Sequence, residues 1–116
     1  FTNISDGTGE SAVTKINPAS LQANGAGLAC NGVKIEKIWV KTAGTGVDML
    51  WKASSNALAE TVPANVMMSF DYSSFGGIPN NAGTGKTGEL VFTTVGATSG
   101  SRYTIIIEAI KTYAAA

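Results

Sequence analysis

The side chains most often used for acid–base and nucleophilic catalysis are nearly absent from this 116-residue chain, which has no histidine and one cysteine, Cys30. Without histidine, a Ser-His-Asp triad, a Cys-His dyad and most zinc sites are ruled out. Asp48, Glu89 and Glu108 fall in predicted strands, but glycoside hydrolysis needs two carboxyl groups that face one cleft, and the sequence gives no sign of that. We expect no enzymatic activity, no metal and no cofactor.

Residues 80–87, with the sequence NNAGTGKT, resemble the end of a phosphate-binding loop. Such a loop needs a glycine five positions before the Gly-Lys-Thr, and it runs from a strand into a helix. Asn80 occupies the glycine position, and the residues after Thr87 have the pattern of a strand. The sequence therefore predicts a glycine-rich turn here. The segment DGTGE that begins at Asp6 lacks the ligand spacing of a calcium loop and is also predicted to be a turn.

The elements that would position any site are strands, because apolar residues alternate with a period of two along short segments separated by Gly, Asn and Ser. The apolar set switches from Val33 and Ile35 to Ile38 and Val40, and this change of phase predicts a β-bulge at residues 36–37. Residues 44–46 predict a tight turn and a hairpin between the strands on either side. The predicted strands are residues 11–16, 33–42, 47–52, 57–62, 66–72, 87–95 and 102–112.

Seven short strands with glycine-rich turns predict an all-β fold, an antiparallel β-sandwich of the jelly-roll kind or a small barrel. We expect residues 31–116 to form the sandwich domain. Residues 1–30 are rich in Gly, Ala, Ser and Asn, and they are predicted to be an extended N-terminal arm or loops. On this reading, deleting residues 1–9 leaves the domain folded but weakens attachment to a partner.

The surface is predicted to be neutral and polar, since 14% of the residues are charged, compared with about 25% in an average soluble protein. Eight basic residues balance eight acidic ones, and neither sign forms a run. We therefore expect no nucleic-acid partner and no anionic membrane partner. No apolar stretch approaches the roughly 20 residues of a membrane helix. The single cysteine favours assembly in a reducing cytoplasm.

Apolar residues at positions expected to be exposed are candidates for a binding interface. In the strand 102–112, Ile106 and Ile110 lie on the face opposite Tyr103 and Ile105. The aromatic side chains are expected to fill the core, whereas exposure of either tryptophan, Trp39 or Trp51, would favour a carbohydrate platform. The candidate interface residues, from the N-terminal segment, the loop 75–79 and this strand, are Phe1, Ile4, Phe75, Ile78, Ile106 and Ile110.

Three stretches resemble a family of small virion proteins of tailed bacteriophages: residues 47–53 (VDMLWKA), 75–88 (FGGIPNNAGTGKTG) and 98–108 (TSGSRYTIIIE). The resemblance extends over residues 33–112. It implies a head decoration (cement) protein, a homotrimer on the capsid exterior that is assembled in the host cytoplasm and binds the major capsid protein through its N-terminal segment and one edge. A tail, neck or fibre subunit is an alternative, and a carbohydrate-binding β-sandwich module is another.

Overall fold

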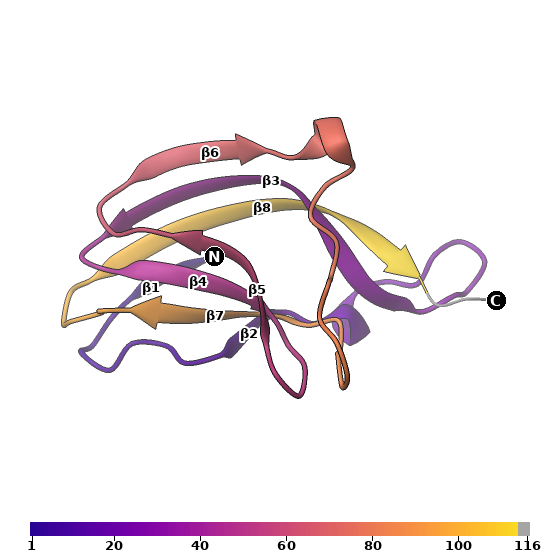
Figure 1. Cartoon of the computed structure of the whole chain (residues 1–116), viewed down its shortest axis with the longest axis horizontal. Coiled ribbons are helices and arrows are strands. Elements are labelled where there is room, and N and C mark those ends of the chain that lie inside the picture. The colour runs from indigo at the N-terminus through magenta and orange to yellow at the C-terminus, as the bar shows by residue number, and fades with distance from the viewer. Residues whose placement is uncertain (114–116) are drawn as a thin grey trace.

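Two four-stranded antiparallel sheets pack face to face in the computed structural model, which describes residues 1–113 (Figure 1). This arrangement confirms the predicted antiparallel β-sandwich. Sheet A has the order β1 (Thr2–Ile4), β8 (Arg102–Tyr113), β3 (Cys30–Ala43) and β6 (Met67–Asp71). Sheet B has the order β2 (Val13–Ile16), β7 (Leu90–Val95), β4 (Gly46–Trp51) and β5 (Ala57–Val62). Two short 3-10 turns are η1 (Pro18–Ser20) and η2 (Ser73–Phe75).

The strand pairs are nested along the chain. β1 pairs with β8, β2 with β7, β3 with β6, and β4 with β5. The first and third of these pairs lie in sheet A and are joined through β3 and β8, whereas the other two lie in sheet B and are joined through β4 and β7. The chain therefore behaves as one long two-stranded ribbon that winds around the core.

The predicted hairpin across residues 44–46 is wrong. β3 ends at Ala43 in sheet A and β4 begins at Gly46 in sheet B, so the turn carries the chain from one sheet to the other. Thr45 is buried in this turn, and its hydroxyl donates a hydrogen bond to the carbonyl oxygen of Gly46 over 2.8 Å. A tight turn has the same local sequence whether the next strand pairs with the last one or crosses above it, so the sequence could not distinguish the two.

The predicted β-bulge is confirmed, because the register between β3 and β8 shifts between Ile35 and Lys37. The shift keeps apolar side chains pointing inward on both sides of the bulge, so Ile35 and Ile38 are both fully buried. The core between the sheets is built from these residues and from Val40, Val47, Met49, Trp51, Leu90, Phe92, Tyr103 and Ile105.

The first 30 residues contain irregular stretches, as predicted, but they also supply one edge strand to each sheet. β1 pairs with β8 from Thr2 to Ile4, and the amide of Ser5 donates to the carbonyl oxygen of Ser101 over 2.7 Å. The Phe1 ring packs edge-on against Phe92, with 5.5 Å between ring centroids. Residues 1–16 are therefore part of the sandwich rather than a separate arm, and the long irregular stretches are residues 5–12 and 21–29.

A polar network closes the sandwich at the edge formed by β1 and β2. The Lys15 ammonium donates to a carboxylate oxygen of Glu10 over 2.6 Å, and the Tyr103 hydroxyl donates to the other oxygen of that carboxylate. Burial, together with this bond to Glu10, raises the pKa of the Tyr103 hydroxyl above its usual value. The network ties the otherwise irregular segment 5–12 to the core strand β8.

Among residues 1–113 there is no helix of the length and apolar character needed to cross a membrane.

Candidate interaction surface

Three apolar side chains lie close together on the outer face of sheet A, and we call Trp39, Met67 and Ile106 the apolar patch. Trp39 on β3 is directly opposite Ile106 on β8, and Met67 on β6 is opposite Lys41, the next outward residue of β3. The exposed fractions of Trp39, Met67 and Ile106 are 41%, 80% and 55%. Opposite residues in antiparallel strands share a face, so the register itself assembles the patch from three strands.

The orientation of Trp39 follows from the bulge. Once the bulge has reset the phase, Ile38 and Val40 point into the core, and the residue between them must point outward. Trp51 has the opposite orientation: it lies on β4 among the inward-facing residues and is fully buried. The expectation that the aromatic residues fill the core therefore holds for Trp51 and is wrong for Trp39.

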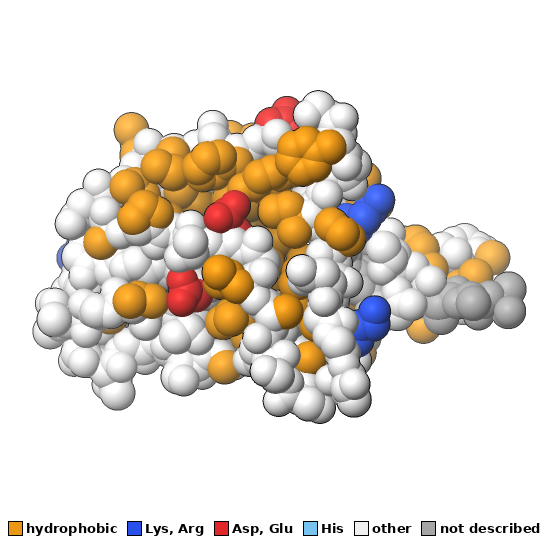
Figure 2. All heavy atoms as spheres, viewed as in Figure 1, with side chains coloured by type: hydrophobic (Ala, Val, Ile, Leu, Met, Phe, Trp, Pro, Cys, Tyr) orange, Lys and Arg blue, Asp and Glu red, His pale blue; other side chains and the backbone are white. Residues whose placement is uncertain are grey.

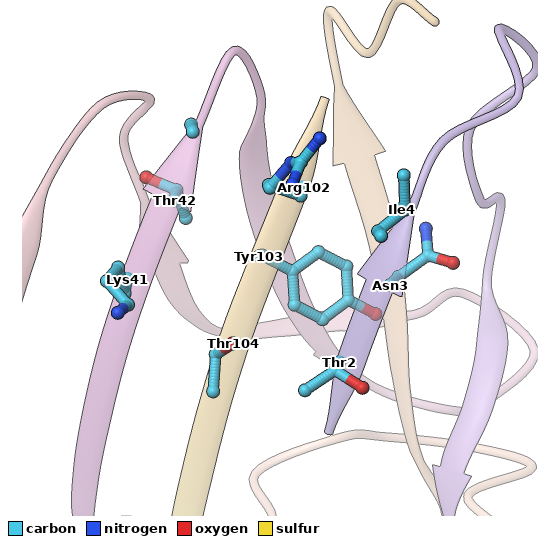
Figure 3. Close-up of a pocket in the computed structure, with 9 residues that line it drawn as sticks. Thr2, Asn3, Ile4, Lys41, Thr42, Arg102, Tyr103 and Thr104 are labelled. Atoms are coloured by element: carbon cyan, nitrogen blue, oxygen red, sulfur yellow. The ribbon is translucent and has the colours of Figure 1, made fainter. Parts of the chain in front are cut away.

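The face around the patch is hollowed by two shallow depressions. One, of about 510 Å³, is lined by the patch together with Lys41, Ser69 and Thr104. The other, of about 710 Å³, lies across β1, β8 and β3, and Figure 3 shows Ile4 and Arg102 at its margin. Lys41 and Thr104 line both depressions, so the two are continuous. Their shallow shape suits contact with another macromolecule over a broad area.

Charged groups border the patch at both ends. Lys41 and Arg102 lie toward β1, while Lys37 and Asp71 form an exposed ion pair of 3.8 Å on the other side. Hydrogen bonds from the side chain and backbone of Ser73 hold the pKa of the Asp71 carboxyl below its usual value. An apolar centre with a polar and charged border is the usual anatomy of a protein–protein interface.

A second exposed apolar cluster lies at the open edge between β6 and β5. The Phe70 and Tyr72 rings are stacked with 6.2 Å between centroids, and the Phe75 ring meets Tyr72 edge-on at 5.9 Å. Figure 2 shows apolar side chains gathered along β6 on this side of the molecule. The Tyr72 hydroxyl donates to the Glu60 carboxylate on β5 and so links the sheets, and burial together with this bond raises the pKa of that hydroxyl.

The candidate interface residues lie in different parts of the structure. Ile4, Ile106 and Ile110 lie outward on sheet A. Phe75 lies in the aromatic cluster at the opposite edge, and Ile78 is half-buried and pairs with Ile35 through two backbone hydrogen bonds of 3.1 and 2.8 Å. Phe1 packs on Phe92. Sequence reasoning missed Trp39 and Met67 as surface residues.

The glycine-rich segment 80–87 and the strand carboxylates Asp48 and Glu89 make contacts within the fold. In the glycine-rich segment, the amide of Lys86 donates to Gly83 and the amide of Thr87 donates to Lys52, so these donors are used within the fold. Asp48 accepts a hydrogen bond from Thr61, and Glu89 pairs with Lys52 at 3.3 Å. Within residues 1–113, no three or more His, Cys, Asp or Glu side chains gather in a way that could hold a metal ion.

Comparison with known proteins found no family model, no curated protein and no solved structure that matches this chain.

Proposed function

We propose that this protein is a decoration (cement) protein of a tailed-phage head, which binds the major capsid protein and stabilises the shell. The observation that supports a binding role is the apolar patch, which lies on a broad, shallow face with a charged border. Exposed apolar surface of this kind marks interaction sites on proteins whose remaining surface is polar. The resemblance of residues 33–112 to small phage virion proteins supplies the class of partner, and a tail, neck or fibre subunit is the alternative within that class.

We also propose that the sandwich is a jelly roll. Within residues 1–113 it has eight strands in two sheets of four, and their nested pairs give the orders β1-β8-β3-β6 and β2-β7-β4-β5. This order is the one expected if a two-stranded ribbon folds back once and winds around a core, as in a jelly roll. Within residues 1–113 no other strand covers the outer face of sheet A, so Trp39 and Ile106 are exposed there.

One observation favours a second function, that of a carbohydrate-binding module. Trp39 is exposed on a strand and has Lys41, Ser69 and Thr104 around it, and an aromatic ring with neighbouring polar groups can stack on a sugar. Buried Trp51 can have no such role. The apolar neighbours Met67 and Ile106 favour protein over sugar as the ligand, because the many hydroxyl groups of a sugar require polar partners in the site.

The test of the proposed function is a binding measurement with shells made of the major capsid protein alone. The Ile106→Glu variant places a carboxylate in the centre of the patch, where contact with the shell would remove it from water. Burial of an unpaired charge is costly, so we expect the variant to bind the shells at least about tenfold more weakly in co-sedimentation.

Leu58→Glu is the matched control, because Leu58 is 52% exposed on β5 in sheet B and Ile106 is 55% exposed on β8 in sheet A. Both variants should keep the melting temperature of the parent protein to within a few degrees, since both positions already face water. Equal binding by the two variants would remove the apolar patch from the proposed interface. Binding of wild-type protein to a glycan array, abolished by Trp39→Ala, would favour the carbohydrate alternative.

A further inference from the structure

β8 has a long backbone edge that no strand within residues 1–113 covers. Its other edge pairs with β3 along its whole length, from Arg102 to Tyr113. On the open side, β1 covers only Arg102 to Thr104, with Phe1 opposite Ile105. Figure 1 shows β8 continuing well beyond β1 toward the C-terminal end of the chain. The edge that follows Ile105 is therefore available to another strand.

The hydrogen-bonding groups on this edge can be assigned from the pairing of Ile105. Its amide donates to the Phe1 carbonyl oxygen over 2.8 Å, and its carbonyl oxygen accepts from the Phe1 ammonium over 2.7 Å. Backbone groups of alternate residues point to opposite sides of a strand. The N–H and C=O groups of Ile107, Ala109, Lys111 and Tyr113 therefore point toward the open side, in line with β1.

The side chains along this edge leave it accessible. Ile110 is 51% exposed and points outward, and residues 106–113 contain no proline, a residue that would prevent strand pairing. The two bulges along this stretch lie in β3, on the other side of β8, and the charged residues of the edge are Glu108 and Lys111. Unpaired backbone groups beside an exposed isoleucine form a template for an added antiparallel strand.

We propose that this edge pairs with the same edge of a second copy of the chain, so that two β8 strands join two copies of sheet A into one continuous sheet. Phe1 limits the register, because pairing along the open edge of β8 must stop before the position opposite Ile105. The longest antiparallel overlap of two described β8 strands that satisfies this condition places Ile110 opposite its twin. Ile107 then lies opposite Tyr113 of the second copy, and Ala109 lies opposite its Lys111.

This register is favourable for both the side chains and the backbone. The two Ile110 residues occupy a non-hydrogen-bonded pair, the type in which side chains are closest, with about 4.5 Å between Cα atoms. No like charges are placed opposite each other, whereas a register centred on Glu108 would bring two carboxylates together and would overlap β1. The inward-facing residues of both strands stay on one side, so the two sandwiches lie on the same side of the shared sheet.

The test is the mass of the 116-residue chain in solution by light scattering after size exclusion, with Ile110→Glu as the variant. We expect the wild-type protein to be a dimer of 11.8 kDa chains and the variant to be a monomer, because two carboxylates would face each other across the axis. Leu58→Glu, at 52% exposure on the other sheet, should remain a dimer. The proposed dimer differs from the homotrimer that the resemblance to phage virion proteins implies. A wild-type monomer, a trimer, or a dimer that Ile110→Glu leaves intact would overturn the proposal.

Cross-linking tests the register directly. In the proposed register, the Cα atoms of the two residues at position 110 lie at a separation that a disulfide can span. Mild oxidation of the Ile110→Cys variant should therefore link the two chains. Cys30 is buried and should not react. Ile106→Cys, on the same face of the same strand, should give little cross-linked product, and equal yields from the two variants would contradict the register. The outcome does not depend on whether the protein decorates a phage head.

Discussion

Deleting residues 1–9 is expected to lower the melting temperature by at least about 10 °C, and thermal unfolding followed by circular dichroism measures it. The deletion removes β1, with its backbone bonds to Ile105 and Ser101. It also removes the Phe1 ring from Phe92 and uncovers the edge of the core at Tyr103. A hydrogen bond contributes about 0.5–1.5 kcal/mol, and 1 kcal/mol shifts the melting temperature of a domain of this size by roughly 4 °C.

The control for this deletion is Ile4→Lys, which keeps β1 and changes only a side chain that points outward and is 66% exposed. Its effect on stability should be within about 0.5 kcal/mol, as for surface substitutions in general. A deletion variant that melts at the parent temperature would show that residues 1–9 are a separable arm, as the sequence alone predicted.

Substitution of Gly88 by alanine is expected to be the most damaging single change outside the large core residues, with a loss of about 3 kcal/mol or more in the free energy of unfolding. Gly88 has a φ of +85°, in the left-handed region, which costs an L-residue roughly 1–2 kcal/mol. A Cβ atom at this position would lie 2.2 Å from the carbonyl oxygen of Asn31 and 3.0 Å from the Pro18 ring. Backbone at the start of β3 would have to move.

The Gly96→Ala variant separates the cost of the left-handed backbone from the cost of the steric contact. Gly96 has a similar φ of +75°, but a Cβ there would meet no atom within 4 Å. This variant should lose only the conformational part, about 1–2 kcal/mol, in a urea titration that compares both variants with the parent protein. Equal losses would show that the contact with Asn31 is relieved at no cost and that the packing of the glycine-rich segment against β3 is loose.

The Gly88 result bears on the segment that resembles a phosphate-binding loop. Its glycines serve the fold: Gly88 permits close approach to Asn31 and Pro18, and a Cβ on Gly85 would lie 2.2 Å from the Ser54 hydroxyl oxygen. The sequence-based prediction of a turn agrees with this arrangement, in which the chain passes from a glycine-rich loop into β7 rather than into a helix.

Local patterns predicted seven of the eight strands within residues 1–113, all except β1, and the inward faces of the long strands. The change of phase between Ile35 and Ile38 located the bulge, and the alternation in β8 correctly placed Tyr103 and Ile105 inward and Ile106 outward. In β3, the inward positions of Ile38 and Val40 likewise require Trp39 to point outward. The general preference of large aromatic residues for the core predicts the opposite and is wrong here.

Features that depend on distant parts of the chain could not be predicted. β1 is only three residues long and has no apolar alternation of its own, so its place is set by pairing with β8, about 100 positions away in the sequence. Met67 joins the apolar patch only because β6 pairs with β3 in a particular register. The turn after Ala43 shows the same limit, since its local sequence does not tell which sheet receives the next strand.

The proposed role places many copies of this chain on the shell of a phage head, with the outer face of sheet A as the contact. Mass spectrometry of purified phage particles from the source of the sequence, with this chain and the major capsid protein quantified together, tests that role most directly. We predict a ratio of one chain per major capsid subunit or a simple fraction of that ratio. A few copies per particle would move the protein to the tail or neck, and its absence from the particles would contradict the virion assignment altogether.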